Sequence, residues 1–158
     1  MLNISPVVEG AQIETVRELL REYQAQLGID LDYQGFQLEL AALPGAYTPP
    51  GGRLLLALYR EAPVGCAALR DAGGGRAEMK RLYVRSAARG LGVGEALARR
   101  VILEAEMAGY RDLVLDTLPT MAQAQHLYER LGFRDIPAYM TSPIAGTRFL
   151  GLTLGETV

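Results

Sequence analysis

The sequence predicts an α+β fold in which helices cover both faces of a mixed, mostly antiparallel sheet of about six to seven strands. Short apolar runs of strand length alternate with segments whose apolar residues recur at helical spacing. Three of the runs follow one another through short turns, which predicts an antiparallel meander. A helical segment separates the third run from the next, and such a crossover implies that these two strands pair in parallel.

Composition and charge limit the class of protein. The chain of 158 residues is interpreted as a single domain, residues 1–158, of ordinary hydrophobic and charged content. A net charge of −2 argues against a nucleic-acid partner. Cys66 is the only cysteine, so an intrachain disulfide is impossible, and no metal is expected. Because neither a signal peptide nor a membrane-spanning run is recognised, we expect a cytoplasmic protein that makes no membrane contact.

The N-terminal part is expected to hold an edge strand and two helices. The strand covers Leu2–Val8 and contains Pro6, which an edge strand tolerates. In Ala11–Leu27 the apolar residues fall at helical spacing, and Gly28 ends that helix. A second helix is expected at Tyr33–Leu43, where a Pro-Gly turn follows.

The middle of the chain carries the meander. Its strands are expected at Arg53–Arg60, Val64–Arg70 and Ala77–Val84. The short segment Glu-Ala-Pro joins the first two strands as a hairpin, and a turn rich in glycine joins the second to the third.

The C-terminal half is expected to add two helices and three strands. The helix Glu95–Met107 is followed by Gly109, a natural C-terminal cap, and by the strand Asp112–Leu118. Pro119 suits the first turn of the last helix, which is expected to run to Leu131. The final strands are expected at Phe133–Ile136 and Thr147–Leu154.

The loop RSAARGLGVG, between the third strand of the meander and the next helix, favours an anion site. Glycines allow a backbone to approach a ligand closely, and a helix N-terminus offers unpaired N–H donors. The alternative is a plain flexible surface loop. A Walker loop is excluded because Gly94 is followed by Glu95-Ala96 rather than Lys-Ser. The spacing of Gly90, Gly92 and Gly94, after a polar strand, fits a dinucleotide-dependent oxidoreductase poorly.

These residues resemble the GNAT superfamily of N-acetyltransferases. The family signature Q/R-x-x-G-x-G/A is matched by Arg89, Gly92 and Gly94, and the segment LYERLGF at Leu127–Phe133 resembles its second hallmark. The resemblance covers essentially the whole chain. It implies an acetyl-CoA-dependent N-acetyltransferase, with acetyl-CoA as co-substrate and a small-molecule or peptide amine as acceptor.

The resemblance also implies how the donor is held. Backbone amides from Arg89 to Gly94 would bind the pyrophosphate of coenzyme A, and the backbone around Leu82–Val84 would align the pantetheine arm. A backbone N–H near Leu82, at the end of the strand, can polarise the carbonyl. We expect the strand to diverge there from its parallel neighbour and open a slot, while Arg85, Arg89 and Arg134 screen phosphate charge. The residues assigned to the cofactor are Leu82, Tyr83, Val84, Arg89, Gly90, Leu91, Gly92, Val93 and Gly94.

Two residues are candidates for catalysis by direct attack in a ternary complex. Periodicity alone favours a core aromatic at Tyr128, but the resemblance implies a general acid for the departing thiolate, and a phenol pKa of about 10 suits that donor. Glu78 is either the general base or a strand-end surface carboxylate. Cys66 is interpreted as a small core residue and not as a nucleophile. Met121 stands where relatives often carry an Asn that contacts the cofactor.

Other polar residues have structural interpretations. Asp116 could support the substrate amine, but a helix cap is favoured. Lys80 and Arg81 are either part of the site or solvated, Glu104 is expected to be solvated, and His126 is expected to be exposed.

The acceptor pocket is expected to lie among three loops. These are Gly28–Tyr33, Leu43–Tyr47 and Tyr139–Pro143, whose acidic and aromatic residues suit a cationic amine with an apolar part. A non-catalytic acyl-CoA-binding regulatory protein is the alternative function. A homodimer formed through the C-terminal strand is also possible.

Overall fold

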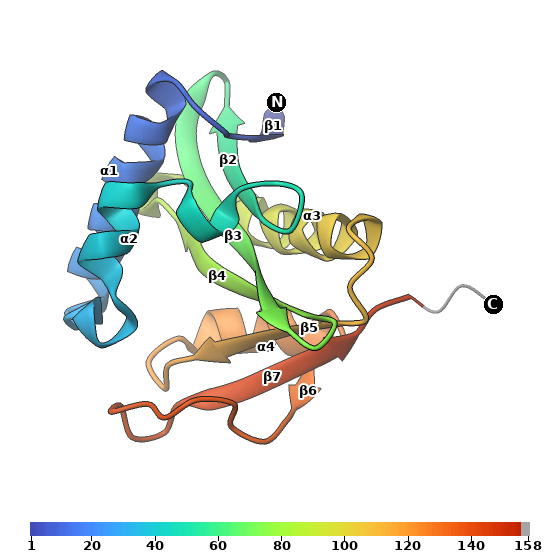
Figure 1. Ribbon diagram of the computed structural model, residues 1–158. Coiled ribbons are helices and arrows are strands. Elements are labelled where there is room, and N and C mark those ends of the chain that lie inside the picture. Colours follow the sequence, from blue (N-terminus) through green and yellow to red (C-terminus); the bar gives the residue numbers. More distant parts are fainter. Residues whose placement is uncertain (156–158) are drawn as a thin grey trace.

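The computed structural model describes residues 1–155 and contains one seven-stranded sheet in the order β1-β2-β3-β4-β5-β7-β6 (Figure 1). All neighbouring strands are antiparallel except β4 and β5, which are parallel. The predicted α+β class and mostly antiparallel sheet are therefore confirmed. The strands are β1 (Leu2–Pro6), β2 (Arg53–Tyr59), β3 (Ala62–Gly73), β4 (Arg76–Val84), β5 (Asp112–Thr117), β6 (Arg134–Asp135) and β7 (Arg148–Thr153).

Helices cover both faces of the sheet, as predicted (Figure 1). One core cluster packs the first two α-helices against β2, β3 and β4, and the other packs the last two against the opposite face and β5 and β7. None of the described helices is long and apolar enough to cross a membrane. The helices are α1 (Ala11–Leu27), α2 (Phe36–Ala42), α3 (Val93–Met107) and α4 (Ala122–Arg130), with 3-10 turns η1 (Leu31–Gln34), η2 (Gly45–Tyr47) and η3 (Ser86–Ala88).

Several predicted boundaries are wrong for local reasons. The helix expected at Tyr33–Leu43 is divided into η1 and α2, because Gly35 adopts a left-handed conformation with φ of 71°. The last helix begins at Ala122, since Pro119 lies in a turn closed by the amide of Met121 on the carbonyl of Leu118. The third α-helix begins at Val93, two positions before the predicted start, and β6 is shorter than expected.

The parallel pair β4 and β5 separates early. Pairing is limited to Arg76 with Asp112, Ala77 with Leu113, and Glu78 with Val114. From residue 79 to residue 84, β4 pairs only with β3 within the described chain, and the remainder of β5 pairs with β7. The two strands therefore diverge as expected beyond Glu78 and Val114 (Figure 1).

A β-bulge in β4 lies beside this opening. Cys66 pairs with Tyr83 and Ala68 pairs with Lys80, so two residues of β4 lie opposite one residue of β3. Within the bulge, Arg81 has a positive φ of 62°, which is uncommon for a residue with a Cβ. The bulge breaks the alternation of side chains, so that Lys80 and Arg81 both reach Gln34 of η1.

The bulge is held by a buried ion pair. Nε and Nη2 of Arg81 each donate to Glu39 of α2 at 2.9 Å, and the guanidinium lies 4.9 Å from the ring centroid of Phe36. The Arg81 side chain is only 3% exposed.

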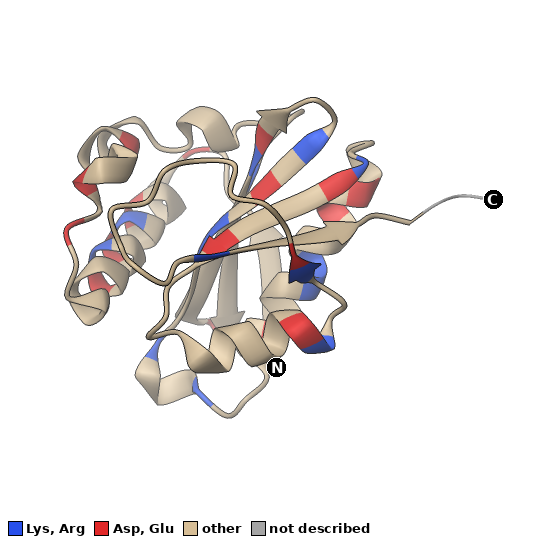
Figure 2. Cartoon of the chain, turned by 90° about the horizontal axis from the view of Figure 1, so that it is seen from below, with Lys and Arg blue, Asp and Glu red and all other residues tan. Residues whose placement is uncertain are grey.

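Acidic and basic positions also lie on neighbouring strands elsewhere in the sheet (Figure 2). Among them, Arg70 of β3 directly faces Glu78 of β4.

We expect Glu39→Ala to lower the free energy of unfolding by about 3 kcal/mol, because it leaves the buried Arg81 guanidinium without its carboxylate. Urea denaturation followed by circular dichroism measures this loss. The matched control is Glu14→Ala, which removes an exposed carboxylate paired with Arg17 and Arg21 and should cost less than about 1 kcal/mol. Equal small losses in the two variants would contradict the structural importance of the buried pair.

Candidate functional site

The loop before α3 has the backbone geometry of an anion site. Gly90 and Gly92 have φ of 85° and 77°, and Gly92 is the N-cap of α3 without any side-chain capping bond. No atom lies within 4 Å of a Cβ built on either glycine. The left-handed backbone, and not crowding, therefore explains why glycine is suitable at these two positions.

Several amides of this loop are free to bind a ligand. The amides of Arg89 and Leu91 donate to the carbonyls of Ser86 and Ala88. In contrast, the amides of Gly90 and of residues 92–95 have no hydrogen-bond acceptor within the described part of the chain. Together with the positive end of the α3 dipole, these five donors can bind a phosphate group.

The three arginines expected near this anion site are not brought together. Arg85 makes a two-point contact with Glu22 of α1, at 2.7 and 3.0 Å, and also donates to a main-chain carbonyl. The hydrogen bond from Arg85 lowers the pKa of the Glu22 carboxyl. Arg89 donates to Gln26 at 3.0 Å. Arg134 lies on β6 and lines a separate hollow with Arg76, so its predicted screening role has no support in the geometry.

The β4 residues assigned to the donor face different sides of the sheet. Leu82 and Val84 pack with the core beneath α3, whereas Tyr83 lies in the opposite core and its hydroxyl donates to Glu22 at 3.1 Å. Val93 is buried and Leu91 is half exposed. The side chains of Leu82, Tyr83 and Val84 therefore do not face one ligand together, and only their main-chain atoms lie along one continuous edge of β4.

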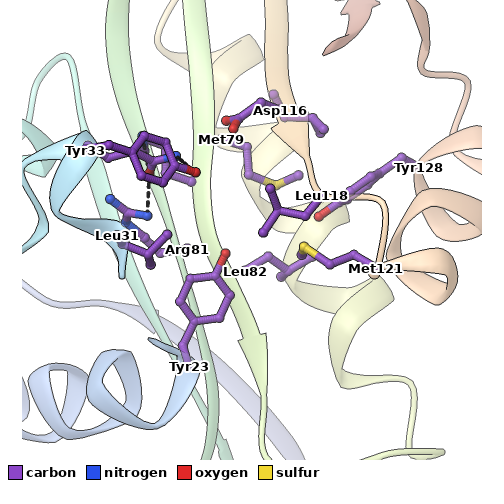
Figure 3. A pocket seen from close by; sticks show the side chains of 13 residues that line it. Tyr23, Leu31, Tyr33, Met79, Arg81, Leu82, Asp116, Leu118, Met121 and Tyr128 are labelled. Carbon is purple, nitrogen blue, oxygen red and sulfur yellow. Dashed lines mark hydrogen bonds between the residues drawn. The ribbon is translucent and has the colours of Figure 1, made fainter. Parts of the chain in front are cut away.

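A pocket lies where β4 and β5 separate (Figure 3). It is walled by the end of α1 and η1, the bulge of β4, and the end of β5 with α4. Burial raises the pKa of Tyr23 to about 12 and also raises that of Tyr33, so both phenols remain protonated hydrogen-bond donors near neutral pH. The lining residues are Tyr23, Leu31, Tyr33, Gln34, Met79, Lys80, Arg81, Leu82, Leu115, Asp116, Leu118, Met121 and Tyr128.

Tyr128 belongs both to the core and to the pocket. It is 4% exposed and packs against Phe133, with the ring centroids 5.7 Å apart. Its hydroxyl points toward Leu118 and the interior of the pocket (Figure 3). Burial raises the pKa of this phenol well above its usual value. The two interpretations of Tyr128 from sequence are compatible, because the ring is core while the hydroxyl faces the site.

Glu78 is enclosed by two partners. It has no exposed surface, Oε1 accepts from Nε of Arg70 at 2.8 Å and lies 2.7 Å from Nη2 of the same guanidinium, and Oε2 accepts from the hydroxyl of Tyr139 at 2.8 Å. The alternative of a strand-end surface carboxylate is therefore wrong. Glu78 is also not among the residues that line the pocket, although it remains the candidate base that the sequence predicted.

Asp116 lines the pocket instead of capping a helix. The N-cap residue of α4 is Met121, and no side chain makes a capping hydrogen bond there. Burial raises the pKa of the Asp116 carboxyl above its usual value. The interpretation of Asp116 as a helix cap is therefore wrong, and its position at the diverging end of β5 was the signal that it faces the pocket.

The remaining predictions divide between correct and wrong. Cys66 is buried with its pKa raised to about 12 by burial, and the side chain of His126 is 75% exposed, as expected. The prediction that Glu104 is solvated is wrong, because this residue is buried and paired with Arg53 and Arg100.

No group of three or more His, Cys, Asp or Glu side chains that could hold a metal ion occurs within residues 1–155.

The three loops expected around the acceptor contribute little to the pocket. The Asp30 carboxylate accepts from the amide of Asp32, whose own carboxylate accepts from the amide of Gln37. Tyr47 is buried in the core of the α1 and α2 face. From these loops only Leu31 and Tyr33 line the pocket, so its charge comes mainly from β4 and β5.

Comparisons with known proteins identify the family. The model of the acetyltransferase (GNAT) family matches residues 13–133. An uncharacterised N-acetyltransferase of Schizosaccharomyces pombe is 36% identical over 157 residues, which cover 98% of this chain and 96% of that protein. The chain therefore belongs to the GNAT family of acetyltransferases, the family that its glycine loop and LYERLGF segment resemble.

Solved structures show the same fold. A GNAT-family acetyltransferase from Staphylococcus aureus superposes with a TM-score of 0.81 at 24% identity, covering 98% of this chain and 100% of that one. A GNAT-family acetyltransferase from Elizabethkingia anophelis with acetyl-CoA bound has a TM-score of 0.70 at 23% identity, covering 97% and 98% of the two chains.

Proposed function

We propose that the protein transfers the acetyl group of acetyl-CoA to a primary amine by direct attack in a ternary complex. The observation that carries this proposal is the position of two sites along one open stretch of β4. Residues 79–82 of this stretch line the pocket that holds Tyr128, and the loop with five free amides follows the end of the strand. A single donor molecule can thus be bound at both ends, with its thioester in the pocket and its phosphate groups at the loop.

Donor binding follows from the free backbone groups. The pyrophosphate is anionic and matches the amides of Gly90 and residues 92–95. The pantetheine arm contains amide groups, which can pair with β4 where β5 is no longer its neighbour. The acetyl-CoA bound to the neighbour from Elizabethkingia anophelis supports this choice of donor.

The reaction requires a hydrogen-bond donor for the carbonyl oxygen, an acid for the departing thiolate and a base for the attacking amine. The nitrogen lone pair attacks the carbonyl carbon, and the negative charge that develops on the oxygen needs a donor. A main-chain amide of the bulge at Arg81 and Leu82 suits this role and would be worth roughly 3–4 kcal/mol. When the carbon–sulfur bond breaks, Tyr128 gives its proton to the thiolate.

Asp116 is the better placed base. The attacking amine must lose a proton, and a carboxylate that lines the pocket can accept it directly. The raised pKa of Asp116 makes its carboxylate a stronger proton acceptor than a solvated aspartate. Glu78 would have to act through Tyr139 or after losing a partner, because both of its oxygens already accept hydrogen bonds.

The first test is acetyl-CoA-dependent release of free thiol across a panel of amines. We expect amine-dependent release by the natural protein, and loss of coenzyme A binding in Gly94→Asp, because the new negative charge would be carried by a residue of the phosphate-binding turn and would repel the phosphates. Gly94→Ala is the control, since its Cβ would make an ordinary contact of 3.6 Å with Val84. Tight acetyl-CoA binding without thiol release from any amine would instead favour a regulatory acyl-CoA-binding protein.

Tyr128→Phe is expected to lower kcat by ~10²–10⁴, because it removes the proton donor and leaves the ring that packs on Phe133. Steady-state kinetics measure kcat, and calorimetry with coenzyme A should show an unchanged Kd. Since burial raises the pKa of Tyr128, deprotonation of this phenol should not reduce the rate of the natural protein near neutral pH. A kcat equal to that of the natural protein would remove Tyr128 from the mechanism.

Asp116→Asn and Glu78→Gln distinguish the two candidate bases. We expect Asp116→Asn to lower kcat/KM by ~10²-fold at neutral pH, with a deficit that shrinks as rising pH deprotonates the free amine. The natural protein should lose activity as acid protonates Asp116, at a pH above the usual aspartate pKa of about 4, because burial raises this pKa. A larger loss in Glu78→Gln, with Asp116→Asn nearly normal, would assign the base to Glu78.

A further inference from the structure

The pocket contains a cation without a carboxylate partner. Nζ of Lys80 donates to Oε1 of Gln34 at 3.3 Å, and this is its one hydrogen bond within residues 1–155. No carboxylate of the described chain lies within ion-pair distance of Lys80. The neighbouring Arg81 is different, because Glu39 already neutralises its guanidinium.

Lys80 is chemically distinct in this chain. It is the only lysine, since every other basic residue among the 16 lysines and arginines is an arginine. An ammonium group is a compact charge whose three donors can turn toward a ligand. Burial and then the neighbouring Arg81 charge lower the pKa of Lys80, and Glu78, Asp116 and Glu39 oppose this shift without reaching ion-pair distance. A carboxylate bound directly at Nζ would offset the remaining cost of burial.

Acetyl-CoA does not provide an anionic group for Lys80 to bind. The acetyl group and the pantetheine arm are neutral, and the anionic part of acetyl-CoA would be bound at the N-terminus of α3. A second cationic group on the acceptor does not fit either, because Lys80 lines the pocket without an ion-pair partner and would repel it. The acidic loop residues that suggested a cationic acceptor make local hydrogen bonds instead.

We propose that the acceptor is an amino acid whose carboxylate pairs with Lys80 and whose amino group contacts Asp116. This inference rests on the proposed acetyl transfer. Lys80 and Asp116 come from the two strands that diverge, so a small molecule between them would contact both sides of the slot. Each charge of the zwitterion would then face an opposite charge, which offsets the cost of removing it from water.

Matched acceptors provide the test. Free amino acids are compared with the corresponding amino acid amides and with the decarboxylated amines, in the thiol-release assay with the natural protein. We expect kcat/KM to be at least roughly ten-fold higher for the free amino acids, because the analogues lack the carboxylate that makes charge-assisted hydrogen bonds to Lys80.

Variants of Lys80 locate the effect. Lys80→Met keeps the length of the side chain without its charge, and we expect it to raise KM for amino acids by roughly ten-fold while the amides and amines change little. Lys80→Arg keeps the charge and should retain part of the preference. Calorimetry with coenzyme A should give the same Kd in both variants, which shows that the donor site is intact.

The outcomes separate this inference from the proposed function. Equal or faster acetylation of the amides and amines, or an unchanged preference in Lys80→Met, would overturn the amino acid assignment and leave acetyl transfer standing. Absence of thiol release with every acceptor would instead overturn the proposed acetyl transfer, and the amino acid assignment would fall with it.

Discussion

The separation of β4 from β5 is the constraint on which the site depends. Two parallel strands that stayed paired along their length would have closed the pocket and used the main-chain groups of β4. Instead, pairing stops after Glu78 and Val114, and a bulge follows in β4. The bulge requires a positive φ at Arg81, and the buried contact of Arg81 with Glu39 of α2 stabilises that conformation. Packing of α2 against the sheet is thus connected to the shape of the site.

The fold and the anion loop could be predicted because their signals are local. Helical periodicity, strand-length apolar runs and turn residues lie within short windows of sequence. Gly90 and Gly92 adopt positive φ in the structure, so their identity directly reports a backbone requirement. The same local logic failed at Gly35, where a single left-handed residue divides a helix that periodicity would continue.

The partners of charged residues could not be predicted, because they are fixed by contacts between distant segments. Glu78 becomes fully enclosed through Arg70 on the neighbouring strand and Tyr139, 61 residues away in the chain. Whether Asp116 caps a helix or faces a pocket depends on where α4 begins, and that start lies three residues later than Pro119 suggested. Even correct strand boundaries would therefore not predict the partners of Glu78 or the surroundings of Asp116.

The open stretch of β4 is also an unpaired strand edge in the middle of a sheet. Such edges are templates for pairing with other chains and are a recognised route to aggregation. In this protein the unpaired stretch is short, it carries the bulge, and Lys80 and Arg81 lie within it. The irregular backbone that exposes main-chain donors to a ligand therefore also makes this edge a poor template for a regular β-strand of another molecule.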